Sequence, residues 1–151
     1  MAERIIFFSE DIRFQCTQKG LIRKWIKETI ESRGLLAGDL NIVFCSDNYL
    51  LDLNKRFLKR NTLTDVIAFQ GDESDLRIGG DIFISIERVQ ENSEKLRTGF
   101  MHELARVMIH GTLHLAGMED NTYAGKREMR TTEDYYLEKI EESLRERQHF
   151  T

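Results

Sequence analysis

The stretch TDVIAFQGDESDLRIGGDIFISI, residues 64–86, determines the fold class that we expect for this chain. Its two ends, Thr64–Phe69 and Asp81–Ile86, are rich in β-branched and aromatic residues, and the second end alternates as a half-buried strand does. The polar segment GDESDLRIGG between them is short enough for an antiparallel pair of strands.

Two further strands and four helices are expected around this pair. The strands are Arg4–Ser9 and Leu40–Cys45; the helices are Lys19–Arg33 (ended by Gly34), a helix capped by Asp47 with Leu50, Leu53, Asn54 and Phe57 on one side, about Thr98–Ala116, and about Gly125–Arg147. The order β-α-β-α-β-β-α-α predicts one α+β domain over residues 1–151, with a mixed sheet of about four strands and four to five helices packed on it.

Composition excludes several classes of protein. The chain has 151 residues and 40% apolar residues, which is enough for one domain with a true core. Its formal net charge of -4 gives no general positive field, so a nucleic acid would have to meet a local basic patch. Cys16 and Cys45 form no CxxC pair and are expected as reduced thiols. Without a signal peptide or a membrane span, the chain is expected to be cytoplasmic.

The strongest chemical signal is the string H-x3-H-x2-G-x2-D, formed by His110, His114, Gly117 and Asp120. Histidines four apart on a helix share a face and can bind one ion, and a glycine can end the helix and turn the chain so that Asp120 supplies a third ligand. The spacing is that of the metzincin site, with Asp in place of the third His. The alternative is a pair of hydrogen-bonded core histidines.

Gly111 occupies the position at which zincins carry their glutamate base. A glycine inside a helix costs roughly 1 kcal/mol relative to alanine, so a packing reason such as the close approach of a strand is expected. The missing glutamate weakens a peptidase interpretation. Three protein ligands leave room for a water whose pKa a metal can lower to about 7, and a phosphodiester is a suitable target for the hydroxide.

A phosphodiester substrate also needs positive charge near the metal. The segment Lys55, Arg56, Lys59 and Arg60 can supply it if folding brings the two together. The alternative is a solvated helix end, where basic residues are favoured by the helix dipole.

Four other residues invite weaker predictions. Glu103, seven residues before His110, is either a hydrogen-bond acceptor behind the ligands or an ordinary surface charge, and Glu119 is expected to be a solvated loop carboxylate rather than a ligand or a base. His102 points away from His110 on an ideal helix, and His149 lies in a charged tail, so neither is expected to be a ligand.

Three blocks of the sequence resemble one known family. HGTLHLAGMED, preceded by ELARVMI, resembles the signature HGxLHLxGxDH of the YbeY family of rRNA-maturation endoribonucleases. LNKRFLKRNTLTDVIAF resembles that family's LN…TDVLSF segment, and GGDIFIS resembles its GDI strand. The blocks occur in the family's order, and their combination is far more specific than any one of them.

The resemblance implies a cytoplasmic bacterial protein with one zinc ion, although nitrogen and oxygen ligands would also accept nickel or iron. It implies a single-strand-specific endoribonuclease that acts in 3′-end maturation of small-subunit (16S) rRNA and in ribosome quality control. Single-stranded RNA, small-subunit rRNA, the ribosome and its proteins are the partners expected on this basis.

Two positions depart from the family pattern. Asp120 stands where the family usually has His, and its negative charge would make a bound ion a poorer Lewis acid. Leu58 stands where many members have Arg, the obvious phosphate holder, so Arg56, Lys59 and Arg60 become the candidates for RNA binding. Two alternatives remain open at this point: a metzincin-like metalloprotease, and a non-catalytic, zinc-stabilised ribosome-assembly factor.

Overall fold

Four strands and five helices make up the part of the chain that the structure, a computed structural model, describes: residues 4–71 and 76–149. In chain order they are β1 (Arg4–Ser9), α1 (Lys19–Ser32), β2 (Leu36–Cys45), α2 (Asp47–Phe57), β3 (Val66–Gln70), β4 (Arg77–Ser85), α3 (Ile86–Leu96), α4 (Phe100–Leu115) and α5 (Tyr123–His149). The expected α+β class, with a mixed sheet and a potential ligand helix towards the C-terminus, is confirmed.

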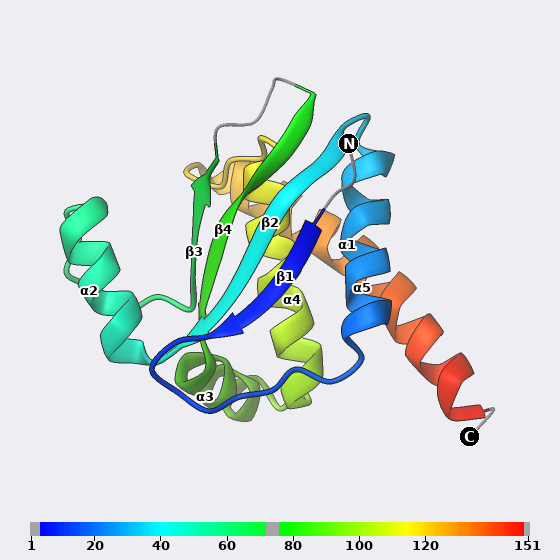
Figure 1. The fold of residues 1–151 in the computed structure, drawn as a ribbon, viewed down its shortest axis with the longest axis horizontal. Coiled ribbons are helices and arrows are strands. Elements are labelled where there is room, and N and C mark those ends of the chain that lie inside the picture. Colours follow the sequence, from blue (N-terminus) through cyan, green and yellow to red (C-terminus); the bar gives the residue numbers. More distant parts are fainter. Residues whose placement is uncertain (1–3, 72–75, 150–151) are drawn as a thin grey trace.

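The sheet has the strand order β1-β2-β4-β3 (Figure 1). β1, β2 and β4 are parallel, because α1 connects the first two and the segment containing α2 connects the next two. β3 runs antiparallel to β4, with pairs from Val66↔Ile84 to Gln70↔Gly80. The antiparallel pair expected from residues 64–86 is therefore confirmed, and it places the TDVIAF segment at one edge of the sheet.

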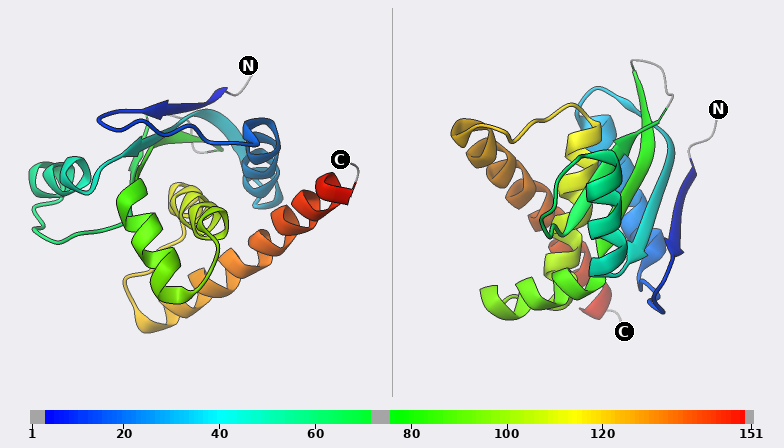
Figure 2. Two further views of the ribbon diagram at one scale, coloured as in Figure 1. Left: turned by 90° about the horizontal axis from the view of Figure 1, so that it is seen from below. Right: turned by 90° about the vertical axis from the view of Figure 1, so that its left-hand side faces the viewer.

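α4 is the central helix of the molecule. It packs against one face of the sheet, with α1, α3 and α5 around it (Figure 2). Ten of its residues are buried, and most of them join a core that also contains Trp25 and Ile26 of α1, Ile82 of β4 and Leu137 of α5. α2 instead packs with a smaller cluster that includes Leu50, Ile67 and Phe83.

Gly111 explains how closely α4 can approach the sheet. A Cβ atom at this position would lie 2.7 Å from Cγ2 of Ile82, nearer than such atoms pack. The expected packing reason for a glycine inside this helix is therefore confirmed: it lets α4 contact β4 directly.

Several element boundaries differ from those expected. α3 was not predicted from the sequence, because only Val89 and Ser93 of this polar helix are buried and its apolar stripe is narrow. β2 and β4 each begin four residues earlier than expected, so residues 77–80 of the assumed loop are strand; residues 72–75 of that loop lie outside the described part.

The cap of α2 is also different. Ser46, not Asp47, caps the helix by accepting a hydrogen bond from the backbone N–H of Tyr49. Asp47 lies in the first turn and accepts bonds from Ser85 (2.6 Å) and Arg88 (2.9 Å), which ties the starts of α2 and α3 together.

Two predictions from composition can be compared with the fold. Cys16 and Cys45 are both buried and free, as expected. Among the residues that the structure describes, no helix combines the length and the apolar character that a membrane span requires.

Candidate metal centre

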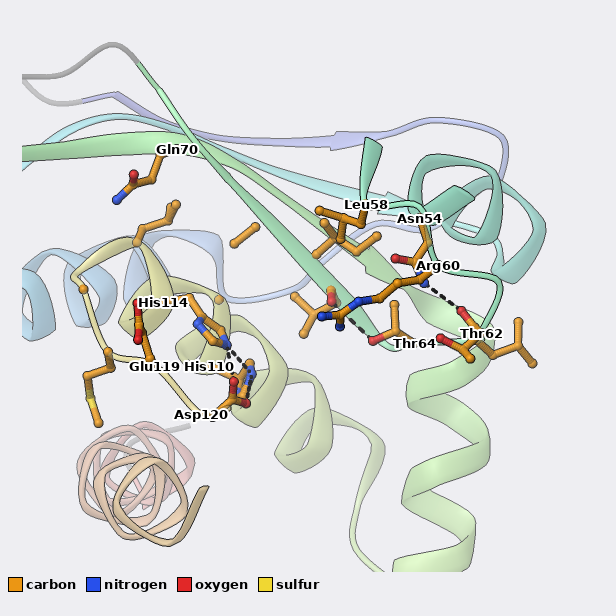
Figure 3. A pocket seen from close by; sticks show the side chains of 18 residues that line it. Asn54, Leu58, Arg60, Thr62, Thr64, Gln70, His110, His114, Glu119 and Asp120 are labelled. Atoms are coloured by element: carbon orange, nitrogen blue, oxygen red, sulfur yellow. Dashed lines mark hydrogen bonds and ion pairs between the residues drawn. The ribbon is translucent and has the colours of Figure 1, made fainter. Parts of the chain in front are cut away.

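His110, His114 and Asp120 converge on one point (Figure 3). The two Nε2 atoms are 3.0 Å apart; Nε2 of His110 is 3.5 Å from Oδ2 of Asp120, and Nε2 of His114 is 3.4 Å from Oδ1 of the same carboxylate. Their side chains are 23%, 32% and 33% exposed, so the cluster borders solvent without being fully open to it.

The end of α4 brings Asp120 to the histidines. Gly117 has φ +99°, its N–H donates to the carbonyl of His114, and the N–H of Met118 donates to the carbonyl of Leu113. This pair of bonds is a Schellman motif, which ends a helix and reverses the chain. The expected role of Gly117 is confirmed: its left-handed conformation folds the next residues back over the histidines.

Glu133 of α5 lies directly behind His110. Its Oε2 is 2.5 Å from Nδ1 of His110, and its Oε1 accepts a bond of 2.9 Å from Arg106, which also pairs with Asp134. An ionised carboxylate can only accept hydrogen bonds, so it places the ring proton of neutral His110 on Nδ1 and leaves the Nε2 lone pair free for a metal.

Glu133 was not among the site residues predicted from the sequence. A signal was present, because this glutamate stands on the apolar stripe of the last helix, with Met129, Tyr136, Leu137 and Ile140. A carboxylate at a core position of that stripe needs partners, and here they are His110 and Arg106.

The carboxylates also control the charge of His110. Burial opposes protonation of its ring, but the hydrogen bond and charge of Glu133, together with Asp120 and Asp65, outweigh burial and raise the pKa of His110. In the absence of a metal, these negative charges favour a positive charge at this point, which is what a cation site requires.

The three side chains form one wall of a groove of about 590 Å³. Arg60 enters the groove from the segment after α2, on the side opposite the histidines (Figure 3). Leu58 lines it too. Arg56 and Lys59 do not: Arg56 pairs with Asp52 at 3.3 Å, and Lys59 is exposed with φ +57°.

The other candidate residues occupy distinct places. Glu103 shares a cavity with His110, but it is only 4% exposed and is neither a surface charge nor bonded to a ligand. Glu119 is an exposed loop residue, as expected. His102 contacts Glu141 and is outside the cluster, and the side chain of His149 lies outside the described part of the structure.

The donor set fits a small transition metal ion. Two ligands of a tetrahedral zinc ion, at bond lengths of about 2.0–2.2 Å, lie roughly 3.3–3.5 Å apart, and the separations here are 3.0–3.5 Å. Three ligands on one side and a groove on the other leave a coordination position that faces solvent, as in catalytic zinc sites.

Comparison with known proteins places the chain in a family. The family described as Endoribonuclease YbeY matches residues 5–141. Proteins named Endoribonuclease YbeY from Amoebophilus asiaticus and Flavobacterium psychrophilum are each 43% identical to this chain; both alignments cover 88% of it, with 90% and 94% of the relatives. The solution structure of a Thermotoga maritima protein superposes with a TM-score of 0.65 at 25% identity, covering 95% of this chain and 93% of that one. The chain therefore belongs to the YbeY family.

Proposed function

We propose that this protein is a zinc-dependent, single-strand-specific endoribonuclease. The observation that carries the proposal is the convergence of His110, His114 and Asp120 at the wall of an open groove, within a chain of the endoribonuclease YbeY family. A zinc ion bound there would supply Lewis-acid chemistry and activate water. Nickel or iron would fit the same donors, so zinc is the part of the proposal that elemental analysis decides.

In this proposal, the residues around the groove have separate roles. Asp120 and the two histidines hold the ion, and Glu133 keeps Nε2 of His110 directed at it. Arg60, across the groove, has the charge and the position to bind a phosphate, a role that Leu58 cannot fill. Arg56 and Lys59 retain only a distant electrostatic contribution in this proposal.

A peptidase function is disfavoured by Gly111. It lies at the position of the zincin glutamate, and its contact with Ile82 leaves no room there for a larger side chain. The family membership points in the same direction.

The natural substrate proposed is small-subunit rRNA, with the chain acting in 16S rRNA 3′-end maturation and ribosome quality control in the cytoplasm. The support for this step is the family membership. Single-strand specificity is the part of the proposal that cleavage of matched single-stranded and duplex RNA decides.

Cleavage of labelled RNA tests the proposal. Purified protein with one equivalent of zinc should cut a single-stranded RNA and leave both a duplex of the same sequence and casein intact. The His114→Ala variant should not cut the single-stranded RNA. Arg60→Ala should reduce cleavage by at least tenfold, whereas Lys59→Ala, which removes the same charge one residue away, is the matched control. Intact RNA, or wild-type rates in Arg60→Ala, would contradict the proposed activity or the proposed phosphate site respectively.

A non-catalytic assembly factor gives a different result in cells. In such a factor, zinc would only stabilise the end of α4, and a His114→Ala protein that kept its fold would still support rRNA processing. Loss of 3′-end maturation by a folded His114→Ala protein would rule out the purely structural role.

A further inference from the structure

The start of α5 carries an exposed stripe of one aromatic and three basic side chains beside the metal centre. Tyr123, Lys126, Arg127 and Arg130 have the spacing i, i+3, i+4 and i+7, which puts them on one side of the helix. All four are exposed, and Tyr123, at 79%, is the most exposed of the large apolar and aromatic side chains in the described residues.

This stripe adjoins the metal ligands directly. Lys126 and Arg130 line a second cavity, of about 250 Å³, whose wall also includes His110 and Asp120. Gly125 keeps the stripe close to the ligand loop, because a Cβ there would lie 2.9 Å from the carbonyl oxygen of Glu119. The metal centre therefore borders two cavities, one with Arg60 and one with the α5 stripe.

The charges of Lys126 and Arg130 are not taken up by ion pairs within the fold, although the charge of Arg130 acts on the buried Glu103. Neither Lys126 nor Arg130 forms an ion pair with any residue that the structure describes. The carboxylates Glu103 and Glu133 in the same cavity are only 4% and 5% exposed, and Glu133 is engaged by Arg106 and His110. Asp65 and Asp120 also line the cavity and are partly exposed, so Lys126 and Arg130 supply positive charge directly beside the ligand carboxylate.

The position of these charges is also unfavourable for the helix itself. The first turn of α5 contains no acidic residue, although the dipole favours negative charge at a helix N-terminus. Lys126 lies in this first turn without an ion-pair partner, and an external anion explains its position better than helix stability does.

Tyr123 adds a second kind of contact. The guanidinium carbon of Arg127 lies 5.7 Å from the centroid of its ring, so one face of the ring is associated with a cation. Basic side chains that follow a phosphate backbone, together with an aromatic ring on which a base can stack, are the combination that binds single strands without reading sequence.

We propose that Tyr123, Lys126 and Arg130 form a docking surface for single-stranded RNA, on the side of the metal centre away from Arg60. Lys126 and Arg130 contact consecutive phosphates, and a base stacks on Tyr123. The proposal rests on the proposed endoribonuclease function and extends it, because the RNA strand then crosses the metal centre between two binding surfaces.

Binding measurements test this surface separately from cleavage. The probe is a fluorescent, nuclease-resistant 2′-O-methyl phosphorothioate oligouridylate of about 12 nucleotides, within the range of known single-strand sites, titrated by anisotropy with the protein as purified. The double variant Lys126→Ala/Arg130→Ala should reduce the steepness of the plot of log K, the association constant for the probe, against log salt concentration. The expected reduction is about 1.4, which is two phosphate contacts at roughly 0.7 each. Lys139→Ala/Arg145→Ala, with the same change in charge farther along α5, should leave the slope unchanged.

The stacking contact has its own pair of variants. Tyr123→Ala should weaken binding roughly 5- to 150-fold, the range of one base–aromatic stack, whereas Tyr123→Phe should bind as the wild type does. Circular dichroism shows whether each variant is folded.

The outcomes separate this proposal from the proposed function. Suppose that the wild type cleaves single-stranded RNA but that Lys126→Ala/Arg130→Ala and Lys139→Ala/Arg145→Ala show the same salt dependence of probe binding. The proposed docking surface is then wrong and the endoribonuclease function stands. If the wild type neither binds the probe nor cleaves RNA, both are overturned. If the double variant binds RNA normally but loses binding of an acidic peptide, the surface serves a protein partner and the RNA proposal is overturned.

Discussion

Glu133 sets the orientation and the proton position of His110. Among the residues outside the ligand set, we therefore expect substitution of Glu133 to lower the metal affinity most. Its carboxylate lies 2.5 Å from Nδ1 of His110 and is braced by Arg106. Glu133→Gln should weaken metal binding about 10- to 100-fold, the usual effect of losing a carboxylate behind a ligand histidine. Competition with a chromophoric chelator measures the affinity.

The neighbouring Asp134 provides the control for that variant. It also pairs with Arg106, at 2.7 Å, but its side chain is 57% exposed and makes no contact with the ligand histidines. Asp134→Asn should keep the metal affinity of the wild type. Equal affinities for Glu133→Gln and the wild type would show that His110 needs no partner at Nδ1.

Glu103 should make stability depend on pH. Burial and the nearby Asp65 carboxylate raise the pKa of Glu103 above its ordinary value of 4.5, although Arg106, Arg130 and His102 oppose the rise. A carboxyl group with a raised pKa in the folded state stabilises the fold fully below the unfolded pKa and loses that contribution as pH rises through the folded pKa.

Glu103→Gln should therefore stabilise the fold, relative to the wild type, more strongly as the pH rises. The difference in unfolding free energy between variant and wild type should grow in favour of the variant as the pH rises above 4.5. Urea unfolding at several pH values measures it, with the exposed Glu138→Gln as control. A difference that stays constant with pH would show that Glu103 does not titrate differently in the two states.

At the level of elements, the residues of this site that could be predicted are those whose positions depend only on neighbouring residues in the sequence. His110, His114 and Gly117 could be interpreted from sequence because the period of a helix and the conformation of a glycine place them without reference to the rest of the chain. Glu133 and the α5 stripe depend on how α5 packs across α4, which spacing along the chain does not specify.

The same distinction accounts for the errors in the elements. α3 was missed because its stability comes from packing on α4 and from its Ser85 cap rather than from a broad apolar stripe. The basic segment after α2 was predicted as one unit, but the end of the helix and the left-handed Lys59 turn only Arg60 into the groove.

The contact between α4 and β4 yields a prediction for the helix. Gly111→Ala adds a methyl group that would lie 2.7 Å from Cγ2 of Ile82, which should cost about 1–3 kcal/mol of stability despite the higher helix propensity of alanine. Thermal or urea unfolding measures the loss.

Gly20 offers a matched control for this substitution. It lies in the first turn of a helix, α1, and a Cβ there would meet nothing within 4 Å. Gly20→Ala should be neutral or stabilising by up to about 1 kcal/mol. If both alanine variants stabilise the protein, α4 and β4 are not held at the distance that the structure gives.

At the scale of the whole molecule, the candidate metal centre joins elements that are far apart in the sequence. His110 and His114 belong to α4, Asp120 to the following loop, and Glu133 connects the centre to α5, whose Trp25–Tyr136 hydrogen bond of 2.8 Å reaches α1. A ligand that binds only the folded arrangement stabilises the whole cooperative unit, and not merely the loop.

Metal removal should therefore lower the melting temperature of the entire domain. At a free metal concentration about 100-fold above Kd, binding adds about 2.7 kcal/mol, which for a chain of this length corresponds to a shift of roughly 5–10 °C. Calorimetry with zinc and with chelator should show this shift in the wild type. His114→Ala should lose the shift, because it removes one of the three ligands. His102→Ala should retain it, because His102 lies on the same helix but contacts Glu141 outside the cluster. A wild-type melting temperature that zinc leaves unchanged, or an equal shift in His114→Ala, would mean that the three side chains do not form the metal site.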